Sequence, residues 1–291
     1  SIKLKTRDMG IHLLNIKRAV AAIVLVCSMG VAYAADFVVD GISYKILSAD
    51  DKTCAVTASE TGYTGDIVVP ATVTNGDNEY AVTTIDNTAF KGNKNITSVA
   101  ISNGVTTLEK STFTGCSNMT LITIPGSVAI IPNGMCMSCS NLVMVNILDG
   151  VESIVDAAFW NCDLTELVLP KSLKTVGANA FKGCELTNIK VYAETPPEIK
   201  ASSFDDDVYN NAVLEVPSSA MSKYKMDTVW GRFSNRAELE QEDETPTSIE
   251  TVKTENGVAV EYYNILGVKV ENPTKGLYIK RCGNKAYKVM L

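Results

Sequence analysis

Apolar residues recur along the middle of this chain in a pattern with a period of 22 or 23 residues. One ladder of positions consists of Phe90, Phe113, Cys136, Phe159, Phe181 and Phe204. A second ladder follows three residues later and consists of Asn93, Cys116, Cys139, Cys162 and Cys184. Apolar triplets keep the same phase, as in Ile96/Val99/Ile101, Met119/Ile122/Ile124, Leu142/Val145/Ile147, Leu164/Leu167/Leu169 and Leu186/Ile189/Val191. Three ladders in phase over about five turns predict a solenoid of stacked coils.

The unit from Leu164 to Glu185 shows which elements each coil should contain. The triplet Leu164/Leu167/Leu169 predicts a short strand that Pro170 ends, and Leu173 with Val176 predicts a second inward segment. Residues 178–181 predict a turn of helix that carries the ladder phenylalanine inward. A period in the twenties with an L-x-x-L-x-L core is typical of leucine-rich repeats. We therefore predict an α/β solenoid dominated by β structure over residues 66–237, including a C-terminal cap.

The sequence on either side of the repeats predicts elements that close the ends of the solenoid. Alternating apolar and polar residues over 37–57, interrupted by Asp-Gly and Asp-Asp, predict hairpin strands and hence an N-terminal β cap over residues 35–65. Such a cap is needed because the open end of a solenoid exposes core and an unpaired strand edge. Residues 218–230, with Tyr224 and Trp230 turned inward, predict a helical closing cap. Acidic residues 238–248 predict a linker, and alternating residues 249–291 predict a small all-β domain.

The first 34 residues differ from the rest of the chain. Lys17 and Arg18 precede an apolar run over 19–26, and Ala32 with Ala34 supplies the small-x-small pattern of a signal-peptide cleavage site. We predict a leader cleaved near Ala34, and therefore a secreted or outer-surface protein. The run is too short to predict a spanning helix. Attachment of a lipid anchor at Cys27 is an alternative. The bulky side chain of Val26 argues against it, because lipoprotein processing prefers a small residue at that position.

Composition and charge narrow the classes of function. The 291 residues are 46% hydrophobic and 20% charged, which predicts a globular chain rather than a disordered one. The formal net charge of −7 gives no basic surface for nucleic acid, so we predict no nucleic-acid partner. The single histidine, His12, lies in the leader, so histidine-dependent nucleophiles and histidine-ligated zinc are excluded. We predict no enzyme activity, no cofactor and no metal site.

The cysteines offer an alternative chemistry. Cys116, Cys139, Cys162 and Cys184 share one inward line, where a free thiol behaves as a small apolar side chain. Stacked coils lie about 4.8 Å apart, which a disulfide tolerates, so spacing alone leaves a bridge open. Cys136-x-x-Cys139 resembles a redox pair or a metal clip, but both positions belong to the core ladders. We favour buried, free thiols, with Met135 and Met137 filling the space beside Cys136.

The outward residues of the strands form the candidate site. Columns of side chains alternate with the inward triplets and include an apolar stripe next to polar groups, which is typical of a protein-binding surface. An ordinary solvent-tolerant sheet surface is the alternative. A glycosidase would need two facing carboxylates, and the stripe supplies only Glu166. The candidate residues are Leu121, Met144, Asn146, Leu148, Glu166, Val168, Lys190 and Tyr192.

The repeat resembles a known family. Leu164-Thr-Glu-Leu-Val-Leu-Pro170, followed by Val176-Gly-Ala-Asn-Ala-Phe-Lys-Gly-Cys184, is similar to the BspA-like leucine-rich repeats, also called the Treponema pallidum type, of surface proteins of Bacteroides and its relatives. The resemblance covers roughly residues 37–237. The tail, over 263–289, resembles C-terminal sorting or anchoring domains of the same bacteria. Two departures concern local packing: Cys136 replaces a phenylalanine, and the position of Gly177 is occupied in other units by Asp86, Lys110, Asn133 or Asp156.

The resemblance implies surface display and adhesion to extracellular-matrix proteins, to other cells or to host receptors. We therefore predict a protein-binding module whose partner is an extracellular or host-surface protein of the matrix type. A carbohydrate-binding or surface-scaffold module of a glycan-utilising bacterium is the alternative. A glycan binder should cluster aromatic residues on one face, and the stripe offers only Tyr192. Membrane association would come only from the leader or from a lipid or surface anchor.

Overall fold

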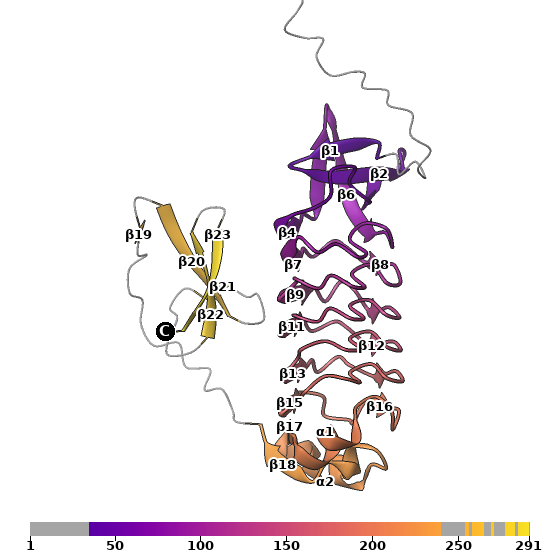
Figure 1. Cartoon of the computed structure of the whole chain (residues 1–291), viewed down its shortest axis with the longest axis vertical. Helices are drawn as coiled ribbons and strands as arrows, with labels where there is room; N and C mark the ends of the chain where they lie inside the picture. Colours follow the sequence, from indigo (N-terminus) through magenta and orange to yellow (C-terminus); the bar gives the residue numbers. More distant parts are fainter. Residues whose placement is uncertain are drawn as a thin grey trace, which may run out of the picture. The chain divides into compact units, whose positions relative to one another are not determined.

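The structure is a computed structural model that describes residues 35–239 and the backbone of short strands within residues 254–290 (Figure 1). The predicted signal peptide and residues 240–248 of the acidic linker predicted over 238–248 lie outside the described residues, whereas Glu238 is the last residue of a strand. Among the described residues, no helix has the length and apolar character needed to cross a bilayer.

A curled sheet closes the N-terminal end of the solenoid. It contains β1 (Phe37–Val39), β2 (Ile42–Ser48), β3 (Thr53–Val56), β6 (Asn78–Ile85) and β5 (Thr72–Asn75) in that order, and β8 (Thr107–Leu108) pairs with β6. Asp40 and Gly41 both have positive φ, at 48° and 79°, as a two-residue hairpin turn of right-handed strands requires. The β5–β6 hairpin, formed by residues beyond 65, belongs to this sheet. The sheet of the cap therefore extends beyond residue 65, where the sequence predicts that the cap ends.

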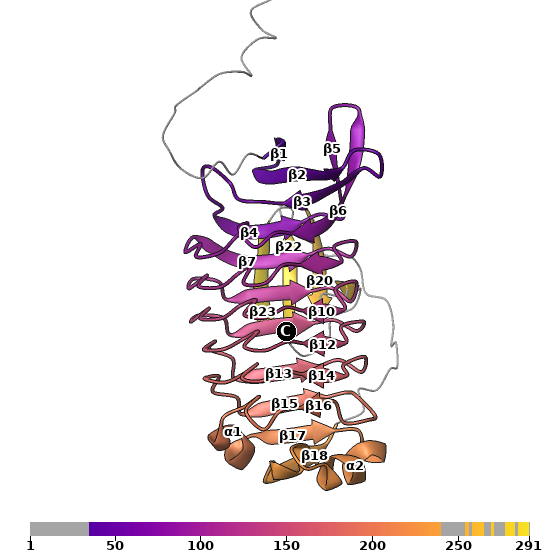
Figure 2. The ribbon, with the colours of Figure 1, turned by 90° about the vertical axis from the view of Figure 1, so that its right-hand side faces the viewer.

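Each coil contributes a longer strand on one side and a shorter strand on another, and the strands of each side stack in parallel (Figures 1 and 2). The longer strands are β4 (Gly65–Val69), β7 (Ile96–Ile101), β9 (Leu121–Ile124), β11 (Met144–Ile147), β13 (Glu166–Leu169), β15 (Asn188–Val191), β17 (Val213–Val216) and β18 (Asn235–Glu238). The shorter strands are β10 (Ile130–Ile131), β12 (Ser153–Ile154), β14 (Thr175–Val176) and β16 (Glu198–Ile199). Paired strands run parallel and in register. For example, Leu121 of β9 lies beside Met144 of β11.

The sheet of longer strands is interrupted between β11 and β13. Within residues 35–239, ladder pairing joins β4, β7, β9 and β11 in one run and β13, β15, β17 and β18 in another. The interruption coincides with the loss of one residue: Leu142 follows Cys139 by three positions, whereas Leu164 follows Cys162 by two. A deletion directly before the strand moves the point at which the strand begins. The shorter strands stay paired across the same coils, so the solenoid remains continuous there.

The phenylalanine ladder fills the interior, as the sequence predicts. Phe90 stacks on Phe113 with ring centroids 5.0 Å apart, and Phe159 stacks on Phe181 at 5.4 Å. Cys136 interrupts this column and is itself fully buried. Met135 is buried beside it, whereas Met137 is partly exposed, so only one of the two methionines fills the gap as expected.

The predicted turn of helix over residues 178–181 is a hydrogen-bonded turn instead. Asn179 has a positive φ of 57°, which a right-handed helix excludes. The amide groups of Asn179 and Phe181 donate to the carbonyl groups of Ser202 and Ser203, in the next coil. Coil-to-coil hydrogen bonds therefore replace the helical ones.

The C-terminal end is closed by short helices, as predicted. They are α1 (Asp206–Asn211), η1 (Ser218–Ala220), α2 (Met221–Met226) and η2 (Trp230–Arg232). Tyr224 and Trp230 are fully buried, and they donate hydrogen bonds to the carbonyl groups of Ala193 (2.9 Å) and Pro197 (2.7 Å). Pro197 directly precedes the last short strand, β16. The cap therefore satisfies backbone groups that the end of the solenoid would leave unpaired.

The remaining strands form an antiparallel sheet, which matches the predicted small all-β domain. Its order is β19 (Thr254–Glu255), β20 (Val258–Asn264), β22 (Leu277–Cys282) and β23 (Lys285–Met290), and β21 (Lys269–Val270) pairs with β20.

Candidate functional site

The outward side chains of the longer strands form one surface, which we call the strand face. Register places Asp66, Ser98, Leu121 and Met144 in one column, continued beyond the interruption by Glu166, Asn188 and Val213. A second column consists of Val68, Ala100, Thr123 and Asn146, continued by Val168, Lys190 and Glu215. The inward neighbours Ile122 and Ile124 are fully buried, so alternation along the strands agrees with the predicted inside and outside.

The apolar part of the strand face lies around β9 and β11. Leu121 and Met144 are directly paired neighbours, and both are partly exposed. Leu148, just after β11, and Val168 on β13 are also partly exposed, and Tyr192 is 40% exposed. The structure thus brings Leu121 and Met144 together on a rigid sheet, as the sequence predicts.

The polar part of the strand face lies beyond the interruption. The ammonium group of Lys190 lies 3.6 Å from a carboxylate oxygen of Glu215, and the side-chain amide of Asn188 donates to the other oxygen at 2.5 Å. The side chain of Glu215 is only 13% exposed, so few water molecules reach its carboxylate. Lys190 and Asn188 provide the contacts that a buried carboxylate needs. Glu166 is exposed and pairs in register with Asn188. Lys190 is therefore part of an ion pair rather than an isolated cation.

Asn146 differs from the expectation for a binding residue. Only 4% of it is exposed, and its amide donates to the hydroxyl oxygen of Thr123, one coil away, at 3.1 Å. A buried amide with an internal partner supports the stacking of two coils, since an unpaired buried polar group would be costly. We therefore leave Asn146 out of the proposed contact surface.

Sequence reasoning missed two features of the strand face. Val68 on β4 is 62% exposed and extends the apolar area to the first coil. Hydroxyl groups form a column just before the strands: Thr120 donates to the carbonyl of Thr97 at 3.1 Å, and Thr187 to that of Thr165 at 3.1 Å. Val143 holds the intervening position of this column and is exposed. The 22- and 23-residue spacing of these positions was the available signal.

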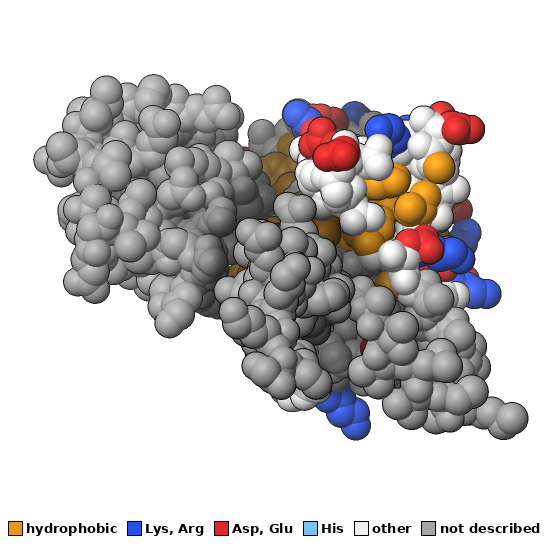
Figure 3. Space-filling model, turned by 90° about the horizontal axis from the view of Figure 1, so that it is seen from above, with side chains coloured by type: hydrophobic (Ala, Val, Ile, Leu, Met, Phe, Trp, Pro, Cys, Tyr) orange, Lys and Arg blue, Asp and Glu red, His pale blue; other side chains and the backbone are white. Residues whose placement is uncertain are grey.

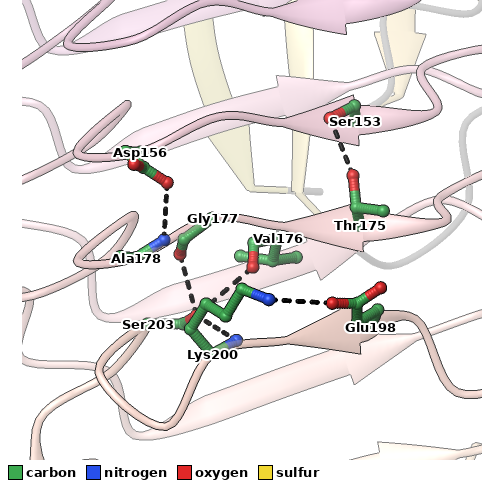
Figure 4. Close-up of polar contacts among 9 residues, drawn as sticks. All are labelled: Ser153, Asp156, Thr175, Val176, Gly177, Ala178, Glu198, Lys200 and Ser203. Carbon is green, nitrogen blue, oxygen red and sulfur yellow. Dashed lines mark hydrogen bonds and ion pairs between the residues drawn. The ribbon is translucent and has the colours of Figure 1, made fainter.

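The side of the shorter strands has polar groups that already pair with one another. The hydroxyl groups of Ser153 and Thr175 lie 2.7 Å apart, and the Lys200 ammonium lies 2.8 Å from the Glu198 carboxylate; both contacts are drawn in Figure 4. Lys174 pairs with Glu152 in the same way at 2.8 Å. Ile130 on β10 is the exposed apolar residue of these short strands. This side therefore serves as the natural comparison for the strand face.

The strand register corrects one of the departures from the repeat pattern: Val176 pairs with Ile154, so Gly177 is aligned with Val155, and Asp156 is aligned with Ala178. The carboxylate of Asp156 accepts a hydrogen bond from the backbone N–H of Ala178 at 2.8 Å (Figure 4). A side chain at Gly177 would meet that carboxylate and would lie 2.6 Å from the backbone nitrogen of Asp156. Glycine in one coil thus makes room for aspartate in the preceding coil.

A smaller apolar area lies on the N-terminal cap. Figure 3 views the molecule from above in Figure 1 and shows apolar side chains beside acidic and basic ones. Val38 on β1 and Leu47 on β2 are the large apolar residues that these two strands expose. No His, Cys, Asp and Glu side chains within residues 35–239 are grouped so as to hold a metal ion.

Solved structures and curated proteins give the following comparisons. A leucine-rich repeat protein from Bacteroides ovatus is 23% identical, with 63% of this chain and 60% of that chain covered and a TM-score of 0.47. A leucine-rich repeat protein from T. pallidum is 17% identical, with 64% and 92% covered and a TM-score of 0.47. A leucine-rich cell surface protein from Faecalibacterium prausnitzii is 19% identical, with 65% and 72% covered and a TM-score of 0.32. No curated protein matches the chain.

The family comparison covers the coils that carry the two ladders. The family of the BspA type leucine rich repeat region, in six copies, matches residues 72–188 and 152–224. These residues cover more than half of the chain and include the strands that carry Leu121, Met144 and Glu166. The fold presents an extended repeat surface of the kind that binds other macromolecules. This chain belongs to the BspA type leucine-rich repeat family.

Proposed function

We propose that the chain is an exported or surface-displayed adhesion module whose strand face binds an extracellular protein. The observation that carries this proposal is the in-register pair of Leu121 and Met144, which leaves apolar side chains partly exposed on a rigid parallel sheet. Apolar groups beside polar ones on a flat surface suit a protein partner. The family contributes the coarser statement that leucine-rich repeats are protein-interaction modules.

The proposed contact surface joins the apolar and polar parts of the strand face. Its apolar residues would be buried against the partner and so contribute to affinity. Its polar residues would fix the orientation of the partner and contribute to selectivity. Each contact is modest, so affinity would come from several residues held in fixed positions by the coils. The surface consists of Val68, Leu121, Met144, Leu148, Glu166, Val168, Lys190 and Tyr192.

The cellular setting is part of the same proposal. The predicted signal peptide over residues 1–34 supports export, and the resemblance of residues 249–291 to sorting or anchoring domains supports attachment to the cell surface. The solenoid over residues 66–237 would then be displayed on the N-terminal side of the attachment domain. No catalytic step is required of any residue in this proposal.

A binding panel tests the class of partner. The purified full chain is passed over immobilised extracellular-matrix proteins, intact mucins and enzymatically deglycosylated mucins. The proposal predicts binding to at least one protein surface that survives removal of glycans. Binding that needs the glycans, or binding to isolated glycans alone, would contradict it and support the carbohydrate-binding scaffold.

A further inference from the structure

An Asn-Gly pair forms the tip of the β5–β6 hairpin, which extends away from the coils (Figure 2). Asn75 is the last residue of β5, Gly76 follows it in the turn, and Asn75 pairs in register with Asn78. Both Asn75 and Gly76 are exposed. Gly76 has a positive φ of 61°, and a Cβ placed on it would meet no atom within 4 Å. The backbone of Gly76 is therefore open to solvent.

An asparagine followed by glycine reacts with its own backbone when the glycine nitrogen is free. That nitrogen attacks the side-chain carbonyl carbon of the asparagine, and a succinimide ring closes. The side-chain nitrogen leaves as ammonia and takes up the proton lost by the backbone nitrogen. Water then opens the ring at one of its two carbonyl carbons and gives aspartate or isoaspartate. Glycine favours ring closure because it has no side chain to shield its nitrogen or to restrict its backbone.

Three Asn-Gly pairs lie within residues 35–239, and they differ in what holds the glycine N–H. The N–H of Gly134 donates to the carbonyl of Asp156, in the next coil, at 3.1 Å, and Gly134 is buried. The N–H of Gly104 donates to the hydroxyl of Ser127 at 3.4 Å, which is a long hydrogen bond. The N–H of Gly76 has no hydrogen-bond partner among the described residues. The attacking nitrogen is thus free only at the hairpin tip.

We propose that Asn75 is a site of spontaneous modification, at which the folded chain converts asparagine to isoaspartate and aspartate with water as the co-reactant. Each conversion consumes one water molecule and releases one ammonia molecule, and no oxidant or reductant takes part. The bonded N–H groups of Gly104 and Gly134 protect Asn103 and Asn133, because a local opening has to break these hydrogen bonds before the ring closes. Modification is therefore concentrated in the cap rather than in the coils.

The products change both the charge and the backbone of the hairpin tip. Each adds one carboxylate where Asn75 is neutral, and isoaspartate also lengthens the main chain by one carbon atom. The pairing of Asn75 with Asn78 closes a tight turn, so the longer main chain alters the geometry of that turn. The Lys52 ammonium donates to the side-chain oxygen of Asn78 at 2.8 Å. Since paired residues share one face, the new carboxylate forms on the face that carries this cation.

Peptide mapping tests the proposal, with the protected pairs as internal controls. The purified full chain is incubated in mildly alkaline buffer and digested with trypsin, which places the three Asn-Gly pairs on three different peptides. Tandem mass spectrometry then follows the conversion of amide to acid at each asparagine. We expect Asn75 to convert at least about tenfold faster than Asn133, with Asn103 between them. Asn78, exposed in the same peptide but followed by Glu79, should stay unmodified. Conversion of Asn133 as fast as Asn75 would overturn the proposal.

The same mapping in concentrated urea separates the effect of the fold from that of the sequence. Unfolding removes the hydrogen bonds of Gly104 and Gly134, so all three asparagines should then convert at similar rates. The gain in rate on unfolding should be largest at Asn133 and smallest at Asn75. A preference for Asn75 that is equally large in urea would show that the local sequence, rather than the fold, controls the reaction, and it would contradict the proposal.

A single variant tests the role of the glycine N–H. Ser127→Ala removes the acceptor of the Gly104 N–H and should raise the rate at Asn103 toward that at Asn75. The rates at Asn75 and Asn133 should stay unchanged, which makes them the matched controls. An unchanged rate at Asn103 in the folded variant would contradict the protection that we assign to the hydrogen bond. If this variant does not fold, the comparison of wild-type chain in buffer and in urea still decides, and none of these results depends on partner binding or export.

Discussion

At the scale of single residues, the ladder cysteines take over the role of an asparagine. The side-chain amide of Asn93 donates to the carbonyl of Tyr63, in the preceding coil, at 2.9 Å. The thiol of Cys116 donates to the carbonyl of Phe90 at 3.1 Å, and the following ladder cysteines do the same. A thiol is a weak donor but is small and apolar enough for a dry core. Each cysteine thus links its coil to the preceding one.

The phenylalanine ladder gives a direct test of the core. Phe159 is fully buried and stacks on Phe181, so Phe159→Ala should cost about 3–5 kcal/mol of unfolding free energy through lost burial and a cavity. The adjacent Trp160 is 40% exposed and serves as the matched control. Trp160→Ala should cost less than about 1 kcal/mol. Urea denaturation of the two variants measures the difference, and equal losses would contradict the inward assignment of the ladder.

The contact between Gly177 and Asp156 gives a second test at this scale. Gly177→Ala forces the backbone of two coils apart and should cost about 1–3 kcal/mol. Asp156→Ala removes a solvent-exposed carboxylate that accepts one hydrogen bond from the backbone N–H of Ala178, and it should cost about 1 kcal/mol or less. Thermal denaturation compares the two. A larger loss in Asp156→Ala would show that crowding at Gly177 is not the controlling contact.

At the scale of elements, the caps and the interruption between β11 and β13 decide how far the repeat surface extends. The cap side chains Tyr224, Trp230 and Arg232 reach carbonyl groups near the last short strand, at Ala193, Pro197 and Ala201. In a solenoid each coil contacts only its neighbours, so stability at the end depends on these local bonds. The cap therefore protects the last coils far more than the first.

Removal of one cap hydrogen bond should loosen the C-terminal coils selectively. Trp230→Phe keeps most of the buried ring but leaves the Pro197 carbonyl without its 2.7 Å partner, at a cost of about 1–3 kcal/mol. Hydrogen exchange should speed up in β15 and β17 and stay unchanged in β7 and β9, which are the internal control. Uniform acceleration in all four strands would show that the array unfolds as one unit.

Elements also show what the sequence could and could not predict. The strands, the ladders and the inward Tyr224 and Trp230 were predictable because their periods follow directly from coil geometry. The prediction of a helical turn near Asn179 was wrong. The backbone amide groups of this turn donate hydrogen bonds to the next coil rather than along the chain. The interruption after β11 depends on how one missing residue shifts a neighbouring coil. The burial of Asn146 likewise depends on packing that alternation alone does not specify.

At the scale of the whole molecule, buried ionisable side chains make stability depend on alkaline pH. Burial raises the pKa of Tyr44 and Tyr224 above the ordinary range and raises that of Tyr209 to about 12. The folded state therefore keeps its tyrosine protons where the unfolded chain, with a pKa of about 10, loses them. This stability is fully present below about pH 10 and is lost as pH rises through the folded-state values.

Alkaline titration checks this dependence. Tyrosinate absorbance and far-ultraviolet circular dichroism are followed together in the same sample while the pH is raised from neutral. The buried tyrosines should ionise cooperatively with loss of the β signal above about pH 10, because ionisation requires unfolding. Complete ionisation of all tyrosines at ordinary pKa values, with the β signal intact, would contradict their burial.

The central claim is that the strand face, rather than another surface of the solenoid, binds the partner. The most direct test compares Leu121→Asp/Met144→Asp with Ile130→Asp, which introduces one negative charge at an exposed apolar residue of the shorter strands. Circular dichroism first establishes that both variants remain folded, and binding to the protein found in the panel is then titrated. We predict at least about a tenfold weaker Kd for the strand-face variant and an unchanged Kd for Ile130→Asp. Equal binding by both variants, or unfolding of the strand-face variant, would contradict the account.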